Sequence, residues 1–151
     1  MSNRLYSSRR DSIVNALVTK IKTIDGTGAW LSDLNSQVEH SLKFWDEIDE
    51  FPAIHLNAGA ESREYIGGGV KNRFLTIIIR CYVKEEDTSV QALNKILEDV
   101  ETLLEDNSRL AYTDKQGNTQ YTQQITVESI DTDEGVFDPI GIGEISVTVR
   151  Y

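Results

Sequence analysis

The most regular alternation of apolar and polar positions in the chain lies between residues 74 and 83. This segment is rich in β-branched and aromatic residues, which favour a strand over a helix. Successive side chains of a strand point to opposite faces. One face is apolar throughout and is predicted to lie in the core: Leu75, Ile77, Ile79, Cys81 and Val83. The other face is mixed: Phe74, Thr76, Ile78, Arg80 and Tyr82.

A polar break at residues 84–87 is followed by apolar positions at the three- and four-residue spacing of one helix face. They are Val90, Leu93, Ile96, Leu97, Val100, Leu103 and Leu104. An oxygen side chain at Asp87 or Thr88 is placed to cap this helix. The strand and the helix are joined by only a few residues, and neither can leave its apolar face in water. We therefore expect them to pack on each other and to form the centre of the core.

A second amphipathic helix is predicted from Arg9 to Ile24. Ser8 and Asp11 resemble a capping pair at its start, and Gly26 can supply the left-handed residue that ends it. The segment 27–43 has no sustained period, although Val38 to Phe44 can form a short strand or a turn of helix. Large aromatic residues in such connecting segments usually close the edge of a core, and this is the expected role of Trp30, Phe44 and Trp45.

Further strands are predicted on both sides of the central one. Ala53 to Asn57 forms a strand, and the chain turns through residues 57–60. A hairpin with Gly67 to Gly69 at its turn then leads into the central strand, because such turns need positive φ. Residues 107–118 and 131–143 are predicted to be loops, the first of them a mobile flap. The remaining strands are Tyr121 to Ile130, with Ile125 and Val127 inward, and Glu144 to Tyr151, with Ile145, Val147, Val149 and Tyr151 on one face.

These elements predict an α/β (α+β) fold with one mostly antiparallel or mixed β-sheet and two amphipathic helices. The 151 residues fit a single domain, residues 1–151. No apolar run approaches the roughly 20 residues that span a bilayer, and MSNRLYSSRR has no signal-peptide core. We expect no membrane association and folding in a cytoplasm. Cys81 lies on the apolar strand face, which indicates a buried thiol rather than a reactive one.

The formal net charge of −10 is unevenly distributed. Acidic residues gather at 46–50, 85–87, 98–106 and 131–138, whereas Arg4, Arg9 and Arg10 stand near the N-terminus. Tight binding to a phosphate backbone requires clustered Lys and Arg. The composition therefore argues against a conventional DNA-binding protein.

Residues that could carry catalysis are few. His40 and His55 have no metal-site spacing, and no G-x-S-x-G motif is present. The run GGGVK at 67–71 resembles a phosphate loop, but phosphate loops lead into a helix and this run leads into a strand. The sequence predicts no catalytic residue, no metal site and no cofactor.

Two surfaces are candidates for interactions with other molecules. The acids of the second helix, Glu98, Asp99, Glu101, Glu105 and Asp106, form either a solvated face or a face turned toward DNA that does not bind it. Phe74, Ile78 and Tyr82 are large for an open sheet face, so another subunit or a loop is expected to cover it. With Arg80, they form a candidate subunit interface.

The order of elements resembles the tail terminator proteins of long-tailed bacteriophages. The resemblance extends from about residue 9 to residue 151 and includes SIVNALVTKIKTI, WDEIDEFPAIHLNAGAE, LTIIIRCYVKEED, ALNKILEDVETLLEDN, ITVESIDTDEG and EISVTVRY. It implies a small α/β domain with the two helices packed on one face of the sheet. It also implies a virion protein that forms a ring, usually a homohexamer, at the head-proximal end of the tail tube. Such a ring ends tail polymerisation and offers a surface for head-tail joining.

The resemblance also implies partners and a location. The partners are further copies of the chain, the tail tube protein and a neck or head-completion protein, and assembly takes place in the host cytoplasm. DNA passes through the ring without specific binding, and Glu98, Glu101 and Glu105 are the candidate acidic channel face. A neck or head-completion (head-tail connector) protein is the alternative function, and a small cytoplasmic enzyme is a more distant one.

Overall fold

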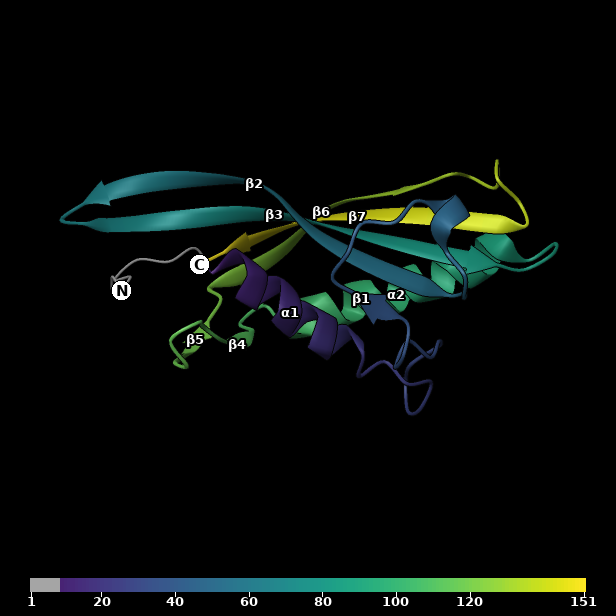
Figure 1. Cartoon of the computed structure of the whole chain (residues 1–151), viewed down its shortest axis with the longest axis horizontal. Coiled ribbons are helices and arrows are strands. Elements are labelled where there is room, and N and C mark those ends of the chain that lie inside the picture. The colour runs from purple at the N-terminus through teal and green to yellow at the C-terminus, as the bar shows by residue number, and fades with distance from the viewer. Residues whose placement is uncertain (1–8) are drawn as a thin grey trace.

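A computed structural model describes residues 9–151 of the chain. Five strands form a mixed sheet in the order β1-β2-β3-β7-β6, in which β1 and β2 are parallel and the other neighbours antiparallel. The strands are β1 (Val38–Glu39), β2 (Ala53–Gly67), β3 (Val70–Lys84), β6 (Gln124–Thr132) and β7 (Ile140–Arg150). The helices α1 (Arg10–Ile21) and α2 (Ser89–Asp106) both lie on one face of this sheet (Figure 1). The predicted fold class is confirmed.

The strand β3 lies in the middle of the sheet and has the alternation that the sequence predicts. Leu75, Ile77, Ile79, Cys81 and Val83 are all buried in the core. Burial raises the pKa of the Cys81 thiol to about 12, so this cysteine is an unreactive part of the core. β2 and β7 flank β3, and β7 buries Ile145, Val147 and Val149 on the same face.

The helix α2 packs directly on β3 and β7. A Cβ atom at Gly143 would lie 3.1 Å from side-chain carbons of both Leu93 and Leu97. At Gly141 it would lie 2.7 Å from Val83 and 3.2 Å from the carbonyl oxygen of Ser89. Glycine at these two positions of β7 therefore lets the N-terminal half of α2 approach the sheet closely.

The apolar stripe predicted for α2 is confirmed at Leu93, Ile96, Leu97, Val100, Leu103 and Leu104, which are buried. Val90, in the first turn of α2, is an exception and is exposed. The predicted cap is also wrong. Thr88 is the N-cap residue, but its hydroxyl donates to Glu85 Oε2 rather than capping the helix, and Asp87 adopts a φ of 62° outside it.

The helix α1 buries Ile13, Val14, Leu17 and Ile21, as its period predicts. It ends at Ile21 rather than Ile24, since the N–H groups of Thr23 and Ile24 donate to carbonyls three residues back and tighten the last turn. Gly26 has a φ of +79° but lies in a later turn. Arg9 is the N-cap residue and makes no side-chain cap, and Ser8 lies outside the described residues.

Two segments that were predicted to be a turn and a loop contain strands instead. β2 continues through residues 57–60, where a register shift between Ala58 and Glu61 forms a bulge against β3. The strand β4 (Ala111–Thr113) lies within the predicted flap, residues 107–118. It pairs with β5 (Thr119–Tyr121), which follows the flap, and Tyr112 of β4 is buried. The hairpin turn at residues 67–69 is confirmed, with all three glycines at positive φ.

The segment between β1 and β2 is fixed to the outer face of the sheet by hydrogen bonds. The Tyr82 hydroxyl donates to the Lys43 carbonyl oxygen at 2.9 Å, and His55 Nδ1 lies 2.9 Å from Ser41 Oγ. Tyr82 and His55 are both buried by this segment, which gives His55 a structural role. Burial lowers the pKa of His55 below its ordinary value; the Glu39 carboxylate, 3.9 Å away, opposes this shift and Lys43 adds to it.

A pair of substitutions in α2 tests the assignment of the helix faces. Leu97→Ala removes a buried side chain and should lower the free energy of unfolding by about 2–5 kcal/mol. Its exposed neighbour provides the control, and Glu98→Ala should change stability by less than about 0.5 kcal/mol. Chemical denaturation measures both, and a larger loss for Glu98→Ala would reverse the assignment.

A pH dependence of stability follows from the buried His55. In the unfolded chain the pKa of a histidine is about 6.5, whereas the fold holds the pKa of His55 lower. Between pH 7.5 and 5.5 the unfolded chain therefore takes up a proton that the folded chain excludes, and the free energy of unfolding should fall as the pH falls. His55→Gln should remove part of this slope in denaturation curves, while His40→Gln, at an exposed position, should keep it. An unchanged slope in His55→Gln would show that another group is responsible.

Candidate assembly surfaces

The predicted subunit interface on β3 is only partly open. Phe74, Ile78 and Arg80 are half-buried on the face of the sheet opposite the helices. Arg80 Nε lies 3.5 Å from Glu144 Oε2 of β7, and the Arg150 guanidinium lies 6.0 Å from the centre of the Phe74 ring. Tyr82 is separate from these three, because the chain's own segment at Lys43 covers it. The structure thus brings three of the four predicted residues to one surface.

The predicted acidic face of α2 is also divided. Glu98 and Glu105 are exposed and Glu101 is half-buried, and their spacing places them on one side of the helix. Asp99 is buried and was wrongly grouped with them. Its carboxylate accepts hydrogen bonds from the N–H groups of Leu31 and Ser32 and from Ser32 Oγ, and so holds residues 31–32 against α2.

The distal half of the β2–β3 hairpin projects from the body of the molecule as a two-stranded arm, residues 61–73 (Figure 1). The last β3 residue paired with β7 within the strands is Phe74, so beyond it β3 has β2 as its ladder partner. Tyr65, Ile66 and Val70 stand at the tip and are 73%, 60% and 58% exposed. An isolated two-stranded ribbon is only marginally stable in water. Apolar side chains at its tip add no hydrophobic stabilisation while they are exposed to solvent.

The base of the arm is held to the body by a cluster of aromatic and charged side chains. Tyr151 donates from its hydroxyl to Glu61 Oε1 at 2.5 Å, and its ring lies beneath the guanidinium groups of Arg9 and Arg73 at 5.0 and 5.4 Å. The backbones of Arg73 and Tyr151 are joined by two hydrogen bonds. The arm is therefore anchored where it leaves the sheet, and its tip extends away from that anchor.

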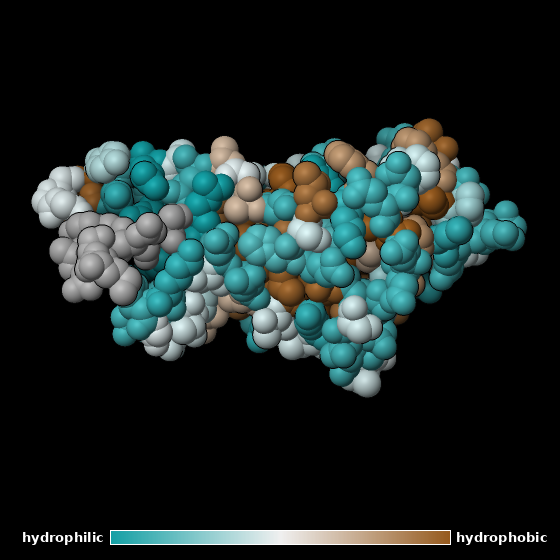
Figure 2. All heavy atoms as spheres, in the orientation of Figure 1, coloured by the Kyte–Doolittle hydropathy of each residue, from teal (hydrophilic) through white to brown (hydrophobic). Residues whose placement is uncertain are grey.

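The opposite end of the molecule carries an exposed apolar patch, which we define as Phe44, Trp45, Val136 and Phe137. The rings of Trp45, in the short helix η1 (Trp45–Glu47), and Phe137, in the β6–β7 loop, have centroids 5.8 Å apart. Phe44 and Trp45 are 61% and 42% exposed, so the prediction that they close the core is wrong. Val136 is 78% exposed. Trp30 does pack against the core. Figure 2 shows brown surface among teal at this end.

Acidic residues surround this patch. Segments 44–51, 85–88 and 131–139 contain four, three and four acidic residues and no Lys or Arg. Glu85 N donates to the Pro139 carbonyl oxygen, and Ser89 Oγ donates to Asp138 Oδ1, so the second and third segments lie together. The Trp45–Phe137 contact adds the first segment. The patch is thus an apolar surface with a strongly acidic rim.

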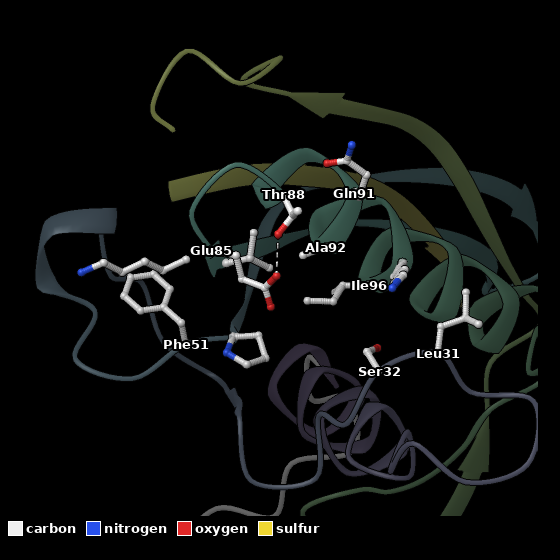
Figure 3. A pocket seen from close by; sticks show the side chains of 12 residues that line it. Leu31, Ser32, Phe51, Glu85, Thr88, Gln91, Ala92 and Ile96 are labelled. Atoms are coloured by element: carbon white, nitrogen blue, oxygen red, sulfur yellow. Dashed lines mark hydrogen bonds between the residues drawn. The ribbon is translucent and has the colours of Figure 1, made fainter. Parts of the chain in front are cut away.

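A hollow of about 450 Å³ opens between α2 and the segment before β2 (Figure 3). Its walls include Leu31, Phe51, Pro52 and Ile96, and the Thr88 hydroxyl donates to Glu85 Oε2 within it at 2.9 Å. None of the side chains that line the hollow belongs to a histidine or a cysteine. Charged side chains, among them Lys84, Glu85 and Lys95, share the lining with the apolar ones.

Within residues 9–151, no group of three or more His, Cys, Asp or Glu side chains is arranged to hold a metal ion. The helices of this part of the chain include none with the length and hydropathy needed to cross a membrane.

Comparisons with known proteins address the family directly. A family model described as Bacteriophage Tail Tube Terminator Protein matches residues 7–151. The tail tube terminator protein p142 of Escherichia phage T5 is 33% identical over 149 residues, which cover 94% of this chain and 92% of that protein. A chain in the solved virion of a native gene transfer agent particle shares the fold, with a TM-score of 0.59 at 9% identity, over 92% of this chain and 96% of that one.

The family model and the T5 relative both extend over nearly the whole chain, and they confirm the resemblance inferred from the sequence. The protein therefore belongs to the bacteriophage tail tube terminator family and is a structural protein of the phage tail.

Proposed function

We propose that the protein forms a ring, expected to be a homohexamer, that caps the head-proximal end of the tail tube. In this position it ends polymerisation of the tube and supplies the surface on which the head is joined. The observation that carries the proposal is the match to the terminator family over residues 7–151. The site of action is the virion, and assembly takes place in the host cytoplasm.

A capping ring acts by binding and has no need of a catalytic centre. We propose that the protein is not an enzyme and uses no cofactor. Its partners are further copies of the chain, the tail tube protein and a neck or head-completion protein. The surfaces described above support this proposal, because apolar side chains are exposed at the arm tip and at the acid-rimmed patch of a small domain.

The outer face of the sheet is proposed as one of the contacts. Phe74, Ile78 and Arg80 lie on it half-buried, with β7 beside them. A further chain packed there would remove the remaining apolar area of Phe74 and Ile78 from water. Tyr82 contributes by holding residue 43 in place rather than by direct contact.

The acids of α2 are proposed to face the hole of the ring. Glu98, Glu101 and Glu105 share one side of the helix, and their charges would repel DNA phosphates. DNA could then pass without being held. A basic lining in the same place would bind phosphates and release counterions.

Deletion of the gene from the phage tests the main proposal. A tube without its cap should keep adding subunits, so the lysate should contain full heads together with unjoined tails that are often longer than normal. Electron micrographs measure tail length and joining. Joined virions of normal length in the deletion lysate would show that the protein is not the terminator, and free heads with normal-length tails would favour a neck role.

Complementation of that deletion separates the role of the α2 acids from the role of the cap. The protein with Glu98, Glu101 and Glu105 all changed to Lys should restore tail length and joining but give fewer infectious particles, because DNA would adhere in the hole. Replacement of the three by Gln is the matched control and should restore more infectivity than the Lys variant. Equal infectivity of the Lys variant and the wild type would mean that these acids only face solvent.

A further inference from the structure

We propose that neighbouring copies of the chain are joined by the arm of one copy, whose tip docks on the Phe44, Trp45, Val136 and Phe137 patch of the next. This inference rests on the proposed ring and names the contact that would close it. The arm and the patch lie at opposite ends of the long axis of the molecule (Figure 1). Each copy therefore offers one of each, which is the requirement for a head-to-tail contact that repeats around a closed ring.

The arm has the shape of an element that can reach onto a neighbouring molecule. At about 3.3 Å per residue, residues 70–73 and the glycine turn carry the tip about 15 Å beyond the end of the β3–β7 pairing. Tyr65, Ile66 and Val70 at the tip are all more than half exposed. Aromatic and aliphatic residues presented in this way are typical anchors of protein interfaces.

The patch has the complementary character. It is built on two segments that are each tied to the sheet, since Tyr82 binds the Lys43 carbonyl and Asp133 accepts hydrogen bonds from the N–H groups of Phe137 and Ile142. Phe137 and Trp45 are thus held in place beside each other before any partner arrives. A preorganised aromatic surface loses little conformational entropy on binding.

Charge favours a second copy as the occupant. The arm, residues 61–73, contains three basic and two acidic residues, and one of the acids, Glu61, is already within 2.9 Å of Arg63. Lys71 lies over the Tyr65 ring at the tip, 5.7 Å from its centre. The three segments around the patch contain only acidic charged groups. The arm as a whole has a net charge of +1, with Glu64 and Lys71 near its tip. An apolar tip on an arm of positive net charge and an acid-rimmed apolar patch are complementary in polarity and opposite in net charge.

Site-directed cross-linking tests this contact in the full-length protein. The natural Cys81 is buried and does not interfere. A chain with both Ile66→Cys and Phe44→Cys, oxidised with copper phenanthroline alone or on purified tail tubes, should give a ladder of disulfide-linked multimers in denaturing gels. The matched control has Tyr121→Cys in place of Ile66→Cys, at an exposed residue of β5 away from the arm tip, and should stay monomeric.

A second pair of variants gives a readout that does not depend on disulfide geometry. Tyr65→Ser with Ile66→Ser removes the tip, and Trp45→Ser with Phe137→Ser removes the patch. Each should lose ring formation by light scattering while still unfolding cooperatively in a thermal melt, because all four side chains lie outside the buried core. In an equimolar mixture, the intact tip of the patch variant can dock only on the intact patch of the tip variant. The mixture should therefore form heterodimers and no rings.

The outcomes distinguish this inference from the proposed function. Rings that persist in both serine variants without any 44–66 cross-link would overturn the arm contact and leave the ring proposal standing. Cross-linking of the cysteine introduced at position 66 to the tube protein, and not to a second copy, would overturn the choice of occupant. A wild-type protein that stays monomeric alone and on tubes would instead overturn the ring proposal itself.

Discussion

The close packing of α2 on β3 and β7 is the interaction on which the rest of the structure depends. Gly141 and Gly143 let the helix reach the sheet, and the leucine and isoleucine side chains of α2 cover the inner face of β3. With α1 beside it, the helical layer occupies one face of the sheet only (Figure 1). One consequence is that neither α1 nor α2 covers the outer face of the sheet, where the segment between β1 and β2 buries His55 and Tyr82, and that the arm tip and the acid-rimmed patch are exposed.

Elements with a long one-sided apolar period were predictable from the sequence. The inner face of β3, the stripe of α2 and the alternation of β7 each follow from burial against a single layer, so local pattern and tertiary structure agree. The bulge in β2 was not predictable, because Asn57 and Gly59 are typical of turns and only the pairing with the long β3 keeps the strand continuous. The β4 and β5 strands are three residues each, too short to show a period.

The candidate surfaces were harder to predict than the fold. Phe44 and Trp45 are large aromatic residues of the kind often found in cores, and no local pattern reveals that both are exposed and that Trp45 packs beside Phe137. Asp99 did carry a signal. It stands three residues after Ile96 and four before Leu103, on the apolar side of the helix, where a carboxylate needs buried partners. Those partners, the N–H groups of residues 31–32, come from a segment without any period.

The exposed apolar groups and the exposed acids are best explained together by assembly. Under the proposed function, the isolated chain exposes groups that its contacts would cover, and the hole of the ring needs a surface that does not bind phosphate. Electron cryo-microscopy of purified virions would examine this directly at the junction of head and tail. We expect one ring of this chain on the last layer of the tail tube, with each arm seated on its neighbour's aromatic patch. Density for the chain inside the head, along the tube or at the distal tip, with none at that junction, would contradict a terminator role.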